Sequence, residues 1–177
     1  MSNNISKLIH LAFVDGQNLY QSLKQHNLEL DLVNFTDFVK QKYKPDVLFW
    51  FVKYTQNDFM LNIYKELEEM GWTIQYSSSN KDIYDSQNNL IGSKTNIDAD
   101  LIVKAMQEYY EEGEYRLVLV SGDGDFVPLL RFFEQKTGKV ILLSASPDTT
   151  SGMLRYDRIN KKNREIIYVA NVADMTQ

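Results

Sequence analysis

Short apolar runs recur along the chain, and longer segments of mixed polarity separate them. Continuous apolar runs are typical of strands that are buried on both faces of a parallel sheet. The predicted strands are residues 9–14, 46–52, 72–76, 117–120 and 139–143, with a last edge strand at 165–169. The predicted helices are residues 19–25, 31–43, 57–70, 96–112, 125–135 and 149–157. This alternation predicts an α/β fold with right-handed βαβ units, a mostly parallel sheet of about five strands and helices on both faces.

Two of these runs end in aspartate and glycine. The run at 117–120 continues into Ser121-Gly122-Asp123-Gly124-Asp125, and the run at 9–14 continues into Asp15-Gly16-Gln17-Asn18. Ligands of open α/β sheets bind beyond the carboxyl ends of the strands, at the point where the strand order reverses. A strand order of 3-2-1-4-5 makes these two strands neighbours. It would bring Asp15, Asp123 and Asp125 into one crevice.

The predicted helix at 96–112 adds a further carboxylate. With the helical period of about 100° per residue, Asp98 shares a face with Leu101 and Ala105 and points toward the core. A carboxylate on an apolar face is costly unless it is paired, which favours a functional role. The alternative is a capping box over residues 95–98, in which the acid serves the start of the helix. Asp100 falls on the opposite face, and we interpret it as an exposed pair with Lys104.

The other polar residues of these segments also have structural interpretations. Asp15 and Ser121 can be simple turn residues. Asn18 and Asp125 can be helix N-caps. Asp123 and Asp125 together are harder to explain as a plain turn, because neighbouring carboxylates repel each other unless a cation or proton intervenes.

Residues 77–95 break the alternation of strands and helices. The segment is polar and rich in Ser and Asn, with two short apolar pieces on either side of Asn88-Asn89. We interpret it as a mobile loop or small hairpin near the active edge. A linker is disfavoured because the alternation resumes at once afterwards, so the 177 residues are expected to form one domain over 1–177.

The composition limits the cell compartment that we expect for the protein and the kinds of metal site that it can form. No apolar run reaches the roughly 18 residues of a membrane span, and the N-terminus lacks a signal-peptide pattern. With zero cysteines, we expect a cytoplasmic protein without disulfides or thiolate metal sites. Two histidines exclude an all-histidine site. Any metal would therefore be held mainly by oxygen ligands, which favours Mg²⁺ or Mn²⁺.

The net charge of −5 gives no overall basic surface for nucleic acid. Binding of a polyanion would need a bound cation or a local basic patch. Candidate cations are Lys81 and Lys94 in the polar segment and the basic C-terminal segment 155–164, with Arg155, Arg158, Lys161, Lys162 and Arg164. A solvated surface is the alternative interpretation of that basic segment. Tyr84 and Tyr156 are candidates for stacking on bases.

Three segments together resemble the NYN domain of the PIN-like nuclease superfamily, in its LabA-like branch. They are residues 13–18, 94–101 and 119–129, and the resemblance extends over about residues 8 to 170. The middle segment departs from the family pattern Lys-Gly-Val-Asp, because Thr95-Asn96-Ile97 stands in place of Gly-Val. The resemblance implies a Rossmann-like (PIN-like) three-layer sandwich and a metal-dependent ribonuclease site. By position, Asp15, Asp98, Asp123 and Asp125 would be the catalytic and metal-binding acids, and Asn18, Ser121 and Lys94 would bind the substrate.

Three functions stay open at this point. The leading hypothesis is a ribonuclease that uses aspartate-bound Mg²⁺ or Mn²⁺ to hydrolyse single-stranded or structured RNA. The alternative is a non-catalytic RNA- or nucleotide-binding module that uses the same acidic pocket. A phosphoryl-transfer enzyme for small molecules is the third, although Gln17 stands where a haloacid-dehalogenase-like enzyme would carry its second Asp. A homodimer remains open as well.

Overall fold

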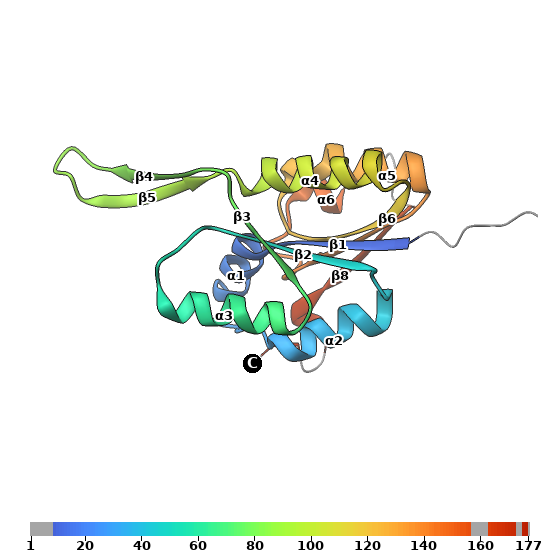
Figure 1. Cartoon of the computed structure of the whole chain (residues 1–177), viewed down its shortest axis with the longest axis horizontal. Helices are drawn as coiled ribbons and strands as arrows, with labels where there is room; N and C mark the ends of the chain where they lie inside the picture. The colour runs from blue at the N-terminus through green and yellow to red at the C-terminus, as the bar shows by residue number, and fades with distance from the viewer. Residues whose placement is uncertain (1–8, 157–162, 173–174, 177) are drawn as a thin grey trace, which may run out of the picture.

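A single parallel sheet forms the centre of the protein (Figure 1). The computed structural model describes residues 9–156, 163–172 and 175–176. The strand order is β3-β2-β1-β6-β7-β8. The strands are β1 (Ile9–Asp15), β2 (Val47–Val52), β3 (Thr73–Tyr76), β6 (Tyr115–Val120), β7 (Val140–Ser144) and β8 (Arg164–Tyr168), and every neighbouring pair is parallel. The predicted order 3-2-1-4-5 is confirmed, and the predicted edge strand pairs with β7 as the sixth.

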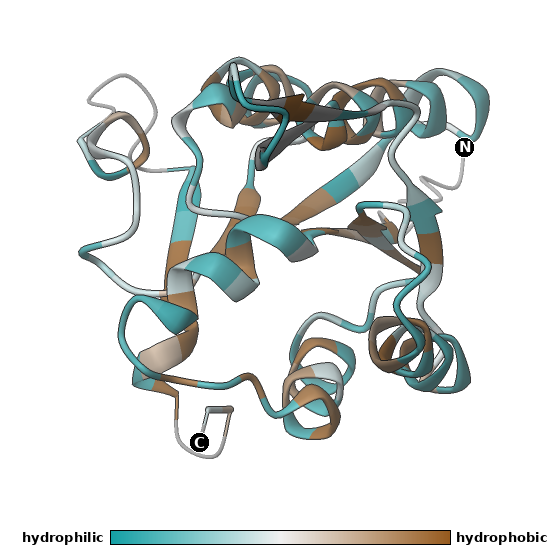
Figure 2. Ribbon diagram, turned by 90° about the vertical axis from the view of Figure 1, so that its left-hand side faces the viewer, coloured by the Kyte–Doolittle hydropathy of each residue, from teal (hydrophilic) through white to brown (hydrophobic). Residues whose placement is uncertain are grey.

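Helices cover both faces of the sheet. They are α1 (Gly16–Lys24), α2 (Leu32–Tyr43), α3 (Asp58–Glu69), α4 (Ile97–Glu111), α5 (Val127–Thr137) and α6 (Gly152–Arg155), with short 3-10 turns η1 (Gly124–Phe126) and η2 (Val169–Asn171). One hydrophobic core lies between the sheet and α1, α2 and α3, and a second lies between the sheet and α4 and α5. Figure 2 shows brown, apolar stretches of the strands between these two layers of helices. None of the helices in these described ranges is long and apolar enough to span a membrane.

Alternate residues of β1 belong to the two cores, as the two-residue period of a strand requires. Val14 packs in the core beneath α1, and Phe13 packs in the core beneath α4. Asp15 is the next residue, so its side chain leaves the strand on the same side as Phe13. The central strand therefore directs this carboxylate toward α4.

The polar segment 77–95 forms an antiparallel hairpin of β4 (Asn80–Tyr84) and β5 (Leu90–Thr95). The hairpin projects away from the body of the molecule beside the start of α4 (Figure 1). Asp100 fastens its base, because its carboxylate accepts hydrogen bonds from the Ser78 N–H at 2.8 Å and the Ser78 hydroxyl at 2.6 Å. The predicted pair of Asp100 with Lys104 is wrong, since Lys104 pairs with Glu108 instead.

Three predicted helices begin two or more residues away from their start in the structure. The first helix begins at Gly16, because the Asp15 side chain caps it three residues earlier than predicted. The segment after β6 forms η1 first and only then α5. The last predicted helix, 149–157, shrinks to α6. Hydroxyl groups before it bond to one another and to backbone carbonyls, as Thr150 does with the Ser146 carbonyl, and such bonds compete with the helical pattern.

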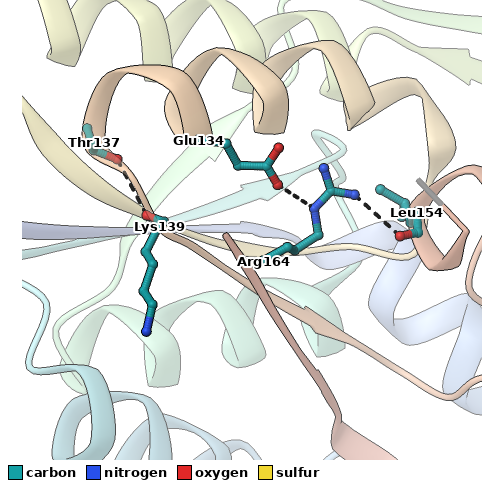
Figure 3. Close-up of polar contacts among 5 residues, drawn as sticks. All are labelled: Glu134, Thr137, Lys139, Leu154 and Arg164. Atoms are coloured by element: carbon teal, nitrogen blue, oxygen red, sulfur yellow. Dashed lines mark hydrogen bonds and ion pairs between the residues drawn. The ribbon is translucent and has the colours of Figure 1, made fainter. Parts of the chain in front are cut away.

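A buried ion pair fastens the edge strand β8 to the helices (Figure 3). Arg164 Nε donates to Glu134 Oε1 of α5 at 2.7 Å, and the two side chains are 3% and 0% exposed. The same guanidinium donates to the Leu154 carbonyl of α6 at 3.3 Å. Arg164 was expected to belong to an exposed basic segment, and this part of the prediction is wrong. Arg158, Lys161 and Lys162 lie outside the described residues.

Candidate functional site

Three carboxylates converge at the carboxyl edge of the sheet. Asp98, Asp123 and Asp125 each offer one oxygen atom, and these atoms lie within 4.8 Å of one another. Asp98 comes from the first turn of α4, and the other two come from the loop after β6. The predicted meeting of these acids is therefore present in the structure. Because carboxylates so close together repel one another, the arrangement favours a bound cation or proton.

Asp98 does not form the capping box that was its alternative interpretation. The N-cap of α4 is Asn96, which makes no side-chain capping bond, and Asp98 lies only two residues later. The Asn96 N–H donates instead to the Ser77 hydroxyl at 3.1 Å. Burial raises the pKa of Asp98, and the charges of Asp123 and Asp125 raise it further.

Asp123 performs the capping role that was considered for Asp125. Its Oδ1 accepts a hydrogen bond from the Asp125 N–H at 2.9 Å at the start of η1. The loop has no room for side chains at its glycines. A Cβ on Gly124 would lie 2.5 Å from the Ser151 hydroxyl, so close packing against the segment before α6 fixes the course of this loop.

Asp15 is the most buried of the four predicted acids, with 3% of its surface exposed. Its Oδ1 accepts from the Asn18 N–H at 3.0 Å, and its Oδ2 accepts from the Ser121 hydroxyl at 3.4 Å. Burial raises the pKa of Asp15 to about 7 against the lowering effect of the Asn18 bond, and the charges of Asp98 and Asp123 add to the rise. Asp15 is not one of the three clustered carboxylates, but it lines the same pocket.

Asn18 and Ser121, both predicted to bind substrate, make contacts that position the acidic loop. The Gly122 N–H donates to Asn18 Oδ1 at 2.8 Å, and the Asp123 N–H donates to the Ser121 hydroxyl at 3.1 Å. These bonds tie the turn after β1 to the loop after β6. A substrate contact by either side chain stays a prediction. Lys94 lies in β5, and its side chain falls outside the described part of the structure.

Three of the four acids, Asp15, Asp98 and Asp123, border an open pocket of about 140 Å³. Its lining residues are Asp15, Gln17, Asn18, Gln21, Thr95, Ile97, Asp98 and Asp123. Sequence reasoning did not assign Gln17, Gln21 and Thr95 to the site. The two glutamines are four residues apart and share one face of α1, but the predicted helix over 19–25 left Gln17 outside it, so this signal needed the true start at Gly16. The Thr95 hydroxyl donates to Gln17 Oε1 at 3.4 Å, which joins the hairpin to α1.

The donor set determines which ligand the pocket can hold. It offers carboxylate and amide oxygens and hydroxyl groups, which suit a hard divalent cation such as Mg²⁺ or Mn²⁺. The three carboxylate oxygens lie within 4.8 Å of one another, so one small cation could contact all three after minor side-chain adjustment. The residues therefore fit a divalent metal.

Comparisons with known proteins give a family and a fold. The family model described as the NYN domain matches residues 11–158. The crystal structure of a Vibrio parahaemolyticus protein of unknown function is similar over 100% of both chains, with a TM-score of 0.73 and 20% sequence identity. At this identity, the likeness shows a shared fold. A comparison with curated proteins finds no match.

Proposed function

The chain belongs to the NYN domain family, and on this premise we propose that it is a metal-dependent ribonuclease that hydrolyses phosphodiester bonds of RNA. The observation that carries the proposal is the convergence of Asp98, Asp123 and Asp125, with carboxylate oxygens within 4.8 Å of one another. In this proposal these three acids hold Mg²⁺ or Mn²⁺. A divalent ion at such a site supplies an activated water and neutralises charge that develops on the scissile phosphate.

The residues around the acids position them. Asp123 is held by its bond to the Asp125 N–H, and Ser121 holds the Asp123 N–H. Hydrogen-bond partners of this kind fix the direction of metal-binding side chains. Asn18 and Ser121 therefore act as positioning residues in the proposal, in addition to any contact with substrate.

Asp15 has a separate role in the proposal. Its carboxyl group lines the pocket from a buried position and accepts a hydrogen bond from the Ser121 hydroxyl, and its raised pKa lets it hold a proton near neutral pH when no ion is bound. A bound cation would favour the ionised form and make Asp15 the fourth acid of the site. With a cation held by these carboxylates, the acidic pocket of a chain of net charge −5 could accept a phosphate.

The test is cleavage of a labelled RNA that contains single-stranded and paired regions, with Mn²⁺, with Mg²⁺ and with a chelator. We expect cleavage with metal and none with the chelator. Asp123→Asn should lower the rate at least a hundredfold, because it removes a metal ligand and its charge. Asp37→Asn makes the same change on the exposed face of α2, remote from the pocket, and should leave the rate unchanged. A fully active Asp123→Asn variant would disprove the proposal.

Absence of cleavage also has a defined meaning. If the wild-type protein binds RNA in the presence of metal and cleaves none of a varied set, the ribonuclease proposal is wrong. The alternative of a non-catalytic binding module would then replace it. Release of phosphate from small esters, without action on RNA, would instead support a small-molecule phosphoryl-transfer enzyme.

A further inference from the structure

Two exposed tyrosines meet at the edge of the sheet that carries the acidic pocket. Tyr54 follows the end of β2, and Tyr76 is the last residue of β3. Their ring centroids are 5.9 Å apart with an angle of 69° between the ring planes. They are 53% and 46% exposed, so both rings present apolar surface to solvent.

A buried neighbour supports this pair. Tyr64 of α3 is 6% exposed, and its ring centroid lies 6.1 Å from that of Tyr76. The Tyr64 hydroxyl donates to the Lys53 carbonyl at 3.3 Å, which ties α3 to the segment that carries Tyr54. Rings in contact hold one another in place. A ligand that binds to them therefore costs little side-chain conformational entropy.

The tyrosine pair lies at the same carboxyl edge of the sheet as Asp15 but on the opposite face, because Tyr76 packs on Tyr64 of α3 whereas Asp15 faces α4. In the sheet register, Asp15 is opposite Phe51, and Phe51 is opposite Gln75, the residue before Tyr76. Strands are about 4.8 Å apart, so β3 lies about 10 Å from the strand that ends in Asp15. Figure 1 shows the ends of β2 and β3 at the side of the sheet from which the hairpin projects.

We propose that Tyr54 and Tyr76 form a stacking platform for bases of single-stranded RNA whose backbone enters the acidic pocket. The inference rests on the proposed function and specifies its substrate as single-stranded. Aromatic rings stack on any base, and only unpaired bases expose their faces. A chain of net charge −5 gains little from long-range attraction to a polyanion. Stacking is a contribution to affinity that does not depend on that charge.

The test uses an Asp123→Asn background, which removes cleavage under the proposed function but leaves both tyrosines in place. The probe is a fluorescein-labelled oligouridine, and the control probe has the same length and phosphates but abasic positions. Tyr54→Ala and Tyr76→Ala should each weaken binding of oligouridine about tenfold. Phenylalanine at either position should restore it. The abasic probe should bind all these variants equally.

Tyr110→Ala is the matched control, because Tyr110 is 72% exposed and pairs edge-on with Tyr109 near the opposite end of α4. It should bind as the parent does. The slope of log K against log salt should be the same for parent and tyrosine variants, since no phosphate contact is removed. Unchanged binding by both alanine variants, or no binding of oligouridine by the parent, would overturn the platform. So would a tyrosine variant that changes only the oligomeric state, which would indicate a protein interface.

The two proposals fail separately. If wild-type protein cleaves RNA while Tyr54→Ala and Tyr76→Ala leave binding and KM unchanged, the platform is wrong and the ribonuclease stands. If the tyrosine variants lose binding while wild-type protein cleaves no RNA, the ribonuclease is wrong and the platform stands. With both correct, the tyrosine variants should raise KM and leave kcat nearly unchanged, because stacking away from the reacting phosphate is uniform binding.

Discussion

The Asn18 side chain joins the segment that carries Asp15 to the loop that carries Asp123, since its Oδ1 accepts a hydrogen bond from the Gly122 N–H at 2.8 Å. Asn18 lies in α1, just after β1, and Gly122 lies in the loop after β6. The bond therefore sets the distance between Asp15 on one side and Asp123 on the other. This contact exists because the strand order places the carboxyl ends of β1 and β6 next to each other.

Asn18→Ala should weaken Mn²⁺ binding and lower the cleavage rate by about 10- to 100-fold, the range usual for partners that orient metal ligands. The physical reason is that the acidic loop loses its fixed position. The measurement is Mn²⁺ affinity together with RNA cleavage. Asn57→Ala is the control, because Asn57 caps α3 and its loss should cost about 1 kcal/mol of stability without affecting the metal. Equal metal affinity in wild type and Asn18→Ala would contradict the positioning role.

Asp15 should make the stability of the metal-free protein depend on pH. Its folded pKa is about 7, above the ordinary value of 3.8, so its folded form favours the proton. The contribution of Asp15 to the free energy of unfolding is fully present below about pH 4. It falls by roughly 4 kcal/mol as the pH rises to about 7. Asp15→Asn should remove that fall, and thermal unfolding in chelator from about pH 5 to 8 measures the difference. Parallel pH profiles for the two proteins would contradict the assignment.

Much of this site followed from the sequence because its signals are local. The sequence shows an apolar run that ends in Asp and Gly both at Asp15 and near Asp123. The helical period placed Asp98 on the inner face of α4. The strand order then needed one assumption about neighbours, which the structure confirms. The family model over residues 11–158 agrees with the resemblance in the three motif segments.

What the sequence did not predict depends on contacts between distant segments. Asp100 was interpreted from its own helix as a partner of Lys104, whereas its carboxylate holds Ser78 at the base of the hairpin. Arg164 looked like one cation among several, whereas Glu134 neutralises it inside the protein. The pairing of Tyr54 with Tyr76 needs the register of β2 and β3. Periodicity describes a residue's own element and says nothing of the partner across the fold.

Gly16→Ala should destabilise the protein by about 1–3 kcal/mol, as overpacking of a buried site does. A Cβ at this position would clash with Trp50 Nε1 and lie 3.0 Å from the Phe51 carbonyl oxygen. The start of α1 must then shift, and Asp15 shifts with it, so activity should fall as well. Denaturant unfolding measures the loss. Gly152→Ala meets only an ordinary contact at 3.7 Å and should be tolerated; equal stability of both variants would refute the packing argument.

Glu134→Gln should destabilise the protein by about 3–5 kcal/mol, because it leaves the buried Arg164 without its negative partner. Replacing both residues by apolar ones of similar size, as in Glu134→Leu with Arg164→Met, should recover part of that loss. The control is Glu69→Gln, which breaks a pair with Lys65 whose side chains are 68% and 75% exposed, and it should change stability by less than about 0.5 kcal/mol. A small effect of Glu134→Gln would show that β8 does not depend on this pair.

The central claim is that carboxylates from α4 and from the loop after β6 form one divalent-cation site. The most direct measurement is a Mn²⁺ titration followed by electron paramagnetic resonance, on wild type, Asp98→Asn and the control Asp37→Asn. The account predicts that wild type and Asp37→Asn bind Mn²⁺ alike and that Asp98→Asn binds it at least about tenfold more weakly. Mn²⁺ binding that is unchanged by Asp98→Asn would contradict the claim, because the site would then lie elsewhere.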